Sequence, residues 1–252
     1  MTSPDYTEPS DPEIGQGDPT AEPTDNEIGQ GLWVAGTVSA RLKALRNPDR
    51  AAEMAAYIKF QQEFLGVPMP EVRKIALRTG TEWRPGHLGA ARVAIERLWQ
   101  GVFREERYAA QHLADRWRVW RWPESLELFE WMVKTGRWWD LVDSVATRCV
   151  GKLLLTYPER NETVFAWIHH EDAWLRRTAL LCQLHHKERT DTAALEAMIL
   201  QTAHEEDFFI RKAIGWALRQ YARTAPDWVR DFVGRHEAVL SPLSKREAMK
   251  HL

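Results

Sequence analysis

Residues 137–143 (RWWDLVD) bring together two tryptophans and two carboxylates, the densest set of chemically capable side chains in the chain. Trp139 and Asp143 are four residues apart, so a helix would place them on one face. An aromatic ring beside a carboxylate suits a flat, cationic ligand, because both groups attract positive charge. Spacing alone leaves a structural alternative open, in which Trp138 packs and Asp140 stabilises the start of a helix.

A second segment, residues 172–179 (DAWLRRTA), combines an aromatic residue with two bases. Arg176 and Arg177 point roughly 100° apart on a helix, so at most one of them shares the face of Trp174. Arg177 and the later Lys187 are candidates for a track that binds phosphates. The alternative is an ordinary solvated helix face.

A third segment, residues 208–219 (FFIRKAIGWALR), has a glycine inside a helical pattern. Gly215 costs a helix about 1 kcal/mol relative to alanine. We therefore expect a neighbouring helix or a ligand to approach closely there. Trp216 and Arg219 are three residues apart and are neighbours on the helix surface.

Other kinds of chemistry lack the residues they need. The histidines at 169–170 and 185–186 are adjacent pairs, not the i, i+4 pairs that bind one metal. Phosphate-binding glycine loops and serine nucleophile elbows are absent. Cys149 and Cys182 are too few for a disulfide framework and fit a reducing cytoplasm. The sequence predicts no metal site and no cofactor, and it predicts that both cysteines are small core residues.

The elements that position these residues read as helices from Leu32 onward. Strand alternation is absent, and prolines recur where helices would begin. In the second half, helical pairs recur about every 35–40 residues, which indicates an all-α solenoid of HEAT-like or armadillo-like pairs. We expect helices over residues 33–46, 48–64, 70–79, 87–100, 104–119, 123–136, 139–156, 159–169, 172–187, 190–204, 207–223, 226–235 and 242–251.

The charge of −2 is unevenly distributed. Residues 1–31 carry eight acids and no Lys or Arg, so residues 32–252 hold 28 acids against all 34 bases, a net +6. The first segment, which repeats EIGQG, is predicted to be a disordered acidic tail. The basic remainder points to a polyanionic partner, with a normally solvated surface as the alternative. No apolar run is long enough to span a membrane, and the start of the chain resembles neither a signal nor a transit peptide.

Taken in order, these segments resemble the AlkD family of HEAT-like-repeat DNA glycosylases. The likeness covers about residues 33–252 and leaves the acidic tail outside it. It rests on five linked segments, with two weaker ones near the start: residues 137–143, 174–179 (WLRRTA), 183–187 (QLHHK), 208–219 and 240–252 (LSPLSKREAMKHL), then 53–57 (EMAAY) and 64–68 (FLGVP).

The resemblance implies a fold and an activity. The fold would be a right-handed α-solenoid with a basic concave face, formed by residues 32–252. The activity would be base excision repair, by excision of N3- and N7-alkylated, cationic purines from double-stranded DNA without flipping the base into a pocket. Bulky adducts would be tolerated, and self-resistance to a DNA-alkylating compound stays open. We expect a monomer that acts in the cytoplasm, on the nucleoid.

The resemblance also implies roles for individual residues. In the family, matching positions line the lesion site, which makes Asp143, Trp139 and Trp216 the expected catalytic residues. Asp143 would stabilise the oxocarbenium ion and orient water. The expected DNA contacts are Arg177, Arg219, Tyr57, Trp138 and a base of the QLHHK segment, which is Lys187 or is replaced by His185.

Two alternatives stay open. The first is a non-catalytic HEAT-repeat protein that binds damaged or distorted DNA. The second is a helical-repeat scaffold for protein partners, which would carry apolar residues on its concave face. The presence of Trp139 and Asp143 favours the glycosylase.

Overall fold

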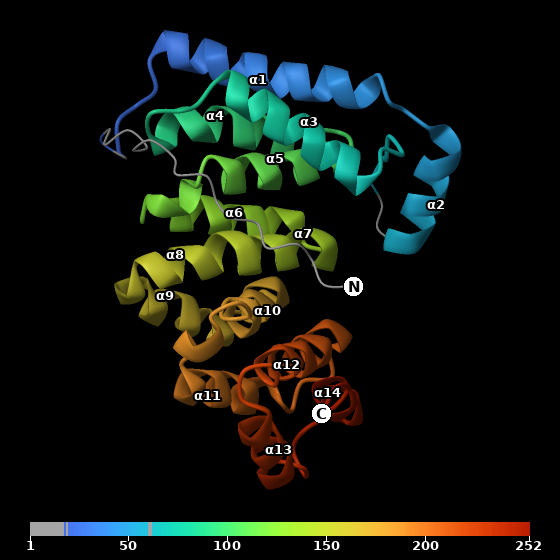
Figure 1. Ribbon diagram of the computed structural model, residues 1–252, viewed down its shortest axis with the longest axis vertical. Helices are drawn as coiled ribbons and strands as arrows, with labels where there is room; N and C mark the ends of the chain where they lie inside the picture. Colours follow the sequence, from blue (N-terminus) through green and yellow to red (C-terminus); the bar gives the residue numbers. More distant parts are fainter. Residues whose placement is uncertain (1–17, 19, 60–61) are drawn as a thin grey trace.

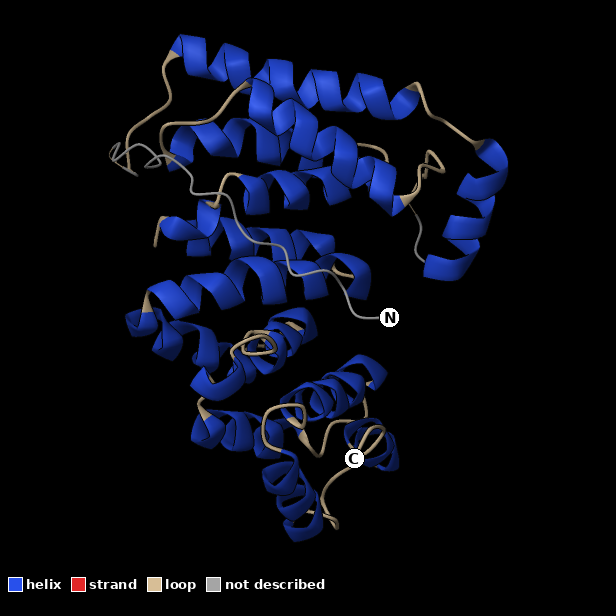
Figure 2. Cartoon of the chain, in the orientation of Figure 1, coloured by secondary structure: helices blue, strands red, loops and turns tan. Residues whose placement is uncertain are grey.

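The computed structural model describes Asp18 and residues 20–59 and 62–252. These residues form helices and loops with no strand, apart from one isolated bridge between Glu63 and Phe103 (Figure 2). Successive helices stack in chain order from α1 at one end to α13 and α14 at the other (Figure 1). The predicted all-α solenoid is therefore confirmed.

Most ends of the predicted helices differ from the observed ones by at most three residues, but α1 begins eight residues earlier than expected, and α2 and α10 end six residues earlier. The α-helices are α1 (Asp25–Lys43), α2 (Pro48–Ile58), α3 (Met69–Glu82), α4 (Leu88–Trp99), α5 (Arg104–Arg116), α6 (Ser125–Gly136), α7 (Trp139–Ser144), α8 (Gly151–Thr156), α9 (Asn161–Ala166), α10 (Ala173–Leu181), α11 (Thr192–Thr202), α12 (Phe208–Tyr221), α13 (Pro226–Arg235) and α14 (Pro242–Ala248). A π-helical segment, Val145–Val150, joins α7 to α8, so the helix expected over residues 139–156 is continuous but wider in its middle.

The expected boundary between a disordered tail and the folded domain, after residue 31, is wrong. Helix α1 begins at Asp25, and Thr24 and Glu27 form a reciprocal capping box at its start. This pattern satisfies two helix-terminal N–H groups, and acids in the first turn favour the helix dipole. Gly31 faces α4 so closely that an added Cβ would lie 2.8 Å from Val93 Cβ. Of the predicted tail, residues 1–17 and residue 19 lie outside the described residues.

The core runs through the whole stack as one cluster of buried apolar side chains. Trp99 and Trp117 are among its largest fully buried members, which accounts for part of the high tryptophan content. Cys149 and Cys182 are buried and unpaired, as predicted. Burial raises the pKa of both thiols, to about 12 for Cys182, so neither is a thiolate at neutral pH. No described helix combines the length and apolar character that crossing a bilayer requires.

Candidate active site

A cleft of about 450 Å³ lies where α2, α7, α10, α12 and α14 meet. It gathers six residues that the sequence singled out, from segments far apart in the chain: Tyr57, Trp139, Asp143, Arg177, Trp216 and Arg219. Four further residues complete its lining: Phe208, Phe209, Lys212 and Glu247. The cleft therefore combines aromatic rings, two carboxylates and three bases in one open hollow.

Asp143 and Arg177 form a two-pronged ion pair at the base of the cleft. The Arg177 Nε lies 2.6 Å from one Asp143 carboxylate oxygen, and Nη2 lies 2.8 Å from the other. The remaining nitrogen, Nη1, donates to the backbone carbonyl of Phe209. The Arg177 side chain is only 5% exposed. Each guanidinium nitrogen is thus engaged within the protein, so Arg177 holds Asp143 in place, and its expected role as a DNA contact stays a prediction.

Two opposing effects set the protonation of Asp143. Burial raises the pKa of this carboxyl above its ordinary value, because charge is poorly solvated there. The hydrogen bonds and positive charge of Arg177 act in the opposite direction and favour the carboxylate. The net result is a raised pKa. In its ionised form the carboxylate is paired with Arg177 in a poorly solvated position, where its field on a nearby cation is strong.

Asp140 has a partner that the sequence did not reveal. Its carboxylate accepts hydrogen bonds from Arg104 Nε at 3.0 Å and Nη2 at 2.5 Å, and from the Tyr108 hydroxyl at 2.5 Å. Arg104 is fully buried and also donates to Gln62 at 2.9 Å. Asp140 does lie in the first turn of α7, as expected, and it also anchors α7 to α5 through a buried ion pair.

The aromatic residues form two groups with different surroundings. Tyr57 is 73% exposed and meets Trp139 edge to face, with ring centroids 6.1 Å apart. Trp138 instead packs between Trp174 and Phe209, at 5.9 and 5.1 Å, and its indole N–H donates to the Ile58 carbonyl. Trp138 does not line the cleft, so its expected role as a DNA contact is not supported by its position.

Helix α12 presents four of its five cleft residues as a single stripe, with Phe209 beside it. Phe208, Lys212, Trp216 and Arg219 follow one another at spacings of four, four and three residues, which keeps them on one face. Lys212 and Arg219 retain partial exposure, with 37% and 24% of their side chains accessible. This stripe is the part of the cleft that offers cationic groups to an incoming anion.

Comparison with known proteins gives the family. The model of the DNA alkylation repair enzyme family matches residues 38–252. This chain belongs to that family. A solved structure from Enterococcus faecalis, described as a predicted DNA alkylation repair enzyme, is 36% identical with a TM-score of 0.73, over 82% of this chain and 96% of that one. No curated protein gives a significant match. The resemblance seen in the sequence is therefore confirmed at the level of the family.

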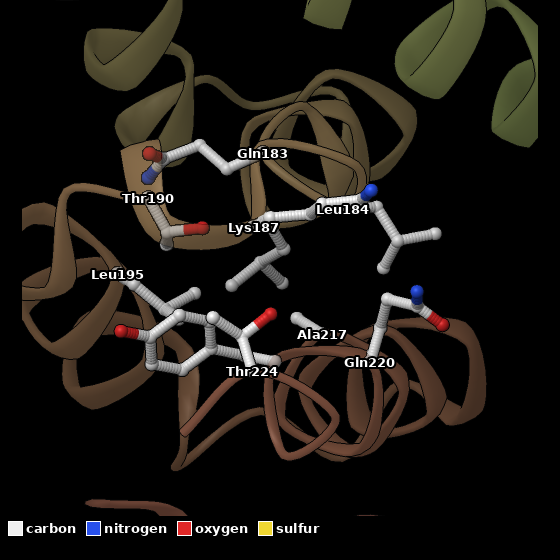
Figure 3. Close-up of a pocket in the computed structure, with 10 residues that line it drawn as sticks. Gln183, Leu184, Lys187, Thr190, Leu195, Ala217, Gln220 and Thr224 are labelled. Atoms are coloured by element: carbon white, nitrogen blue, oxygen red, sulfur yellow. The ribbon is translucent and has the colours of Figure 1, made fainter.

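Besides Trp138, two further expected DNA contacts of this DNA alkylation repair enzyme lie outside the cleft. Lys187 has a positive φ of 52° and borders a separate cavity of about 20 Å³ between the α10–α11 turn and α12 (Figure 3). That space holds about one water molecule. His185 keeps an exposed face, but the protein around its ring partly removes it from water, and this desolvation, with the charges of Arg148 and Lys152, lowers its pKa. A neutral imidazole at this position is a weaker phosphate ligand than a lysine.

Some of the repair enzyme's cleft residues were missed in the sequence. Helical spacing could have predicted the stripe on α12, because Lys212 and Phe208 lie four and eight residues before Trp216 on the same face. Glu247 gave no such signal, since it reaches the cleft only through the docking of α14 on α12.

Among the described residues, no cluster of three or more His, Cys, Asp or Glu side chains is suited to hold a metal ion.

Proposed function

We propose that this enzyme is a DNA glycosylase that hydrolyses the N-glycosidic bond of cationic, N3- or N7-alkylated purines in duplex DNA. The observation that carries the proposal is the Asp143 carboxylate, clamped by Arg177 and flanked by Trp139 in an open cleft. Family membership supports a role in alkylation repair. The monomer would act on DNA in the cytoplasm.

The chemistry suits a single carboxylate. An alkylated purine with a positive charge leaves as a neutral base, because the electron pair of the broken C1′–N bond cancels that charge. No general acid is needed at the base. The sugar develops oxocarbenium character, as in glycoside hydrolysis. Asp143 would stabilise this cation and align the attacking water, whose proton passes to the carboxylate or to solvent.

Arg177 would act on this step through Asp143. By donating to both carboxylate oxygens it fixes their direction and keeps the charge available at neutral pH. A preorganised charge costs no rearrangement when the transition state forms. Phosphates flanking the lesion would instead meet Arg219 and Lys212, which keep accessible side chains.

The shape of the cleft supports excision of a base that stays stacked. Tyr57, Trp139 and Trp216 are among the aromatic residues that line this open cleft. Rings at such positions would contact the deoxyribose and add cation–π attraction to the charged sugar. A bulky adduct on the base would meet no enclosing pocket, so the proposed substrates include it.

The test is release of 7-methylguanine from methylated duplex DNA under single-turnover conditions. Asp143→Asn keeps the shape and removes the charge, and we expect the excision rate to fall roughly 10²-fold or more. DNA affinity should stay equal or rise, because a negative charge near phosphates is lost. Asp231→Asn is the matched control, since Asp231 is 65% exposed outside the cleft. Wild type that binds the duplex but releases no base would instead favour the non-catalytic alternative.

A further inference from the structure

A second carboxylate enters the cleft from the C-terminal helix. Glu247, on α14, places one carboxylate oxygen 3.0 Å from Lys212 Nζ and the other 2.8 Å from Arg219 Nη1. Its side chain is 14% exposed. The hydrogen bond from Lys212 and the nearby positive charges lower the pKa of Glu247, so it is ionised at neutral pH. One acid thus joins the two bases that face the opening of the cleft.

The glycine in α12 allows this arrangement. A Cβ added to Gly215 would lie 2.5 Å from Glu247 Cβ and 2.9 Å from the Ser244 carbonyl oxygen, both too close for real atoms. Ser244 Oγ also donates to the Arg211 carbonyl at 2.9 Å, which fixes α14 against α12. The close approach expected at Gly215 is therefore that of α14, and it delivers Glu247 to the bases.

An acid at this place has a cost for binding. Its negative charge offsets part of the positive charge that attracts phosphates, so it lowers electrostatic affinity for DNA. Its benefit lies in geometry. Lys and Arg side chains have many rotamers, and a bridging carboxylate restricts Lys212 and Arg219 to one arrangement facing the cleft.

We propose that Glu247 is a positioning residue that trades DNA affinity for alignment. It holds Arg219 and Lys212 where they fix the phosphates flanking the lesion, so that the sugar lies against Asp143. This inference rests on the proposed glycosylase activity. Misalignment of reacting groups by about 1 Å can cost 10²-fold in rate, so such a function does not require contact with the reacting atoms.

The experiment compares Glu247→Gln with wild type in excision and in binding. We expect the excision rate at saturating enzyme to fall at least about tenfold. We expect affinity for unmodified duplex to stay equal or rise. The slope of the logarithm of affinity against the logarithm of salt concentration should steepen by about one, because about one more counterion is released. The matched control is Glu205→Gln: Glu205 is 16% exposed and bridges Arg176 outside the cleft, so its loss should change neither quantity.

Two further variants keep the inference open to refutation. Gly215→Ala leaves every charge in place but pushes on α14, and it should slow excision without changing the salt dependence. In an Arg219→Ala background, Glu247→Gln should have a smaller effect on rate and on affinity than it has alone. Melting curves verify that each variant is folded.

Several outcomes would overturn the inference. An unchanged excision rate in Glu247→Gln, or a loss of rate matched by an equal loss of affinity, would show that Glu247 does not align the bases. Strictly additive effects of Glu247→Gln and Arg219→Ala on binding would show that it does not act through Arg219. This double-mutant cycle, which compares DNA binding by the two single variants and the double variant, is independent of catalysis. A wild-type enzyme without excision would refute the proposed function and the alignment for it, while the cycle would still report whether Glu247 acts on Arg219.

Discussion

Asp140 and Asp143 are one turn apart on α7, yet each carboxylate is held by an arginine from a different helix. Arg104 of α5 holds Asp140 away from the cleft, and Arg177 of α10 holds Asp143 inside it. The short helix is thereby fixed at both carboxylates. One ion pair sets where the helix lies, and the other holds a carboxylate at the cleft.

Asp140→Asn should destabilise the fold strongly. The change removes the charge of Asp140 from its buried ion pair with Arg104, and breaking one side of a buried pair typically costs about 3–5 kcal/mol. The sequence alone predicted a cost of about 1 kcal/mol at most, as for a helix-start residue. Urea unfolding curves decide between the two values. Asp231→Asn, at an exposed helical pair, should change the unfolding free energy by less than about 0.5 kcal/mol.

Excision should be lost on acidification, beginning at a higher pH than for an ordinary aspartate. In the proposed mechanism the active form is the Asp143 carboxylate, and burial raises its pKa above the ordinary value, so protonation should remove activity as the pH falls. Single-turnover rates from about pH 4 to pH 8, corrected for spontaneous base loss, measure this midpoint. Arg177→Met removes the group that lowers the pKa and should move the midpoint upward. A midpoint that is the same in both proteins would contradict the role of the Asp143–Arg177 pair.

DNA binding should weaken steeply as salt rises, because phosphate contacts release counterions. Arg219→Ala should weaken binding to every duplex sequence alike and reduce the salt slope by about one. Fluorescence anisotropy of a labelled duplex at several salt concentrations gives both quantities. Lys187→Ala serves as the comparison, since Lys187 lies outside the cleft and should have a smaller effect. Affinity that does not vary with salt would refute a cationic binding surface.

Removal of residues 1–31 should destabilise the protein. A chain that begins at Leu32 lacks the first two turns of α1, its capping box and the Glu27 contact with His87 at 3.2 Å. Loss of a cap alone costs about 1 kcal/mol. We expect a melting temperature at least about 3 °C below that of a chain beginning at Asp18. Equal melting temperatures would show that these turns add nothing to stability.

The fold and half of the site follow from local pattern, and the remainder depends on contacts between distant residues. Periodicity is local, so it located the helices and placed Trp139 and Asp143 on one face. It missed the start of α1 because the acidic, glycine-containing composition masked a capping box at Thr24. Burial is not local. The sequence therefore could not show that Arg177 is enclosed by Asp143 and Phe209.

The same reason explains why the sequence did not reveal the partners of Trp138 and Asp140. Both stand in a motif that looks chemically capable as a whole, but their partners are Ile58, on α2, and Arg104, on α5. Only the stacking of the helices determines which residues of such a motif face outward. Trp139 and Asp143 face the cleft, while Trp138 and Asp140 fix the motif to the layers behind it.

The position of Glu247 on α14 has a consequence for the order in which the protein becomes functional during synthesis. Tyr57 and Glu247 line one cleft, although most of the chain separates them. Domains form from the N-terminus as the chain emerges from the ribosome, so the first layers of the stack can pack early. The cleft lacks one of its walls until α14 has emerged and docked at Gly215. A nascent chain could therefore hold folded layers and exposed bases well before it is competent for repair.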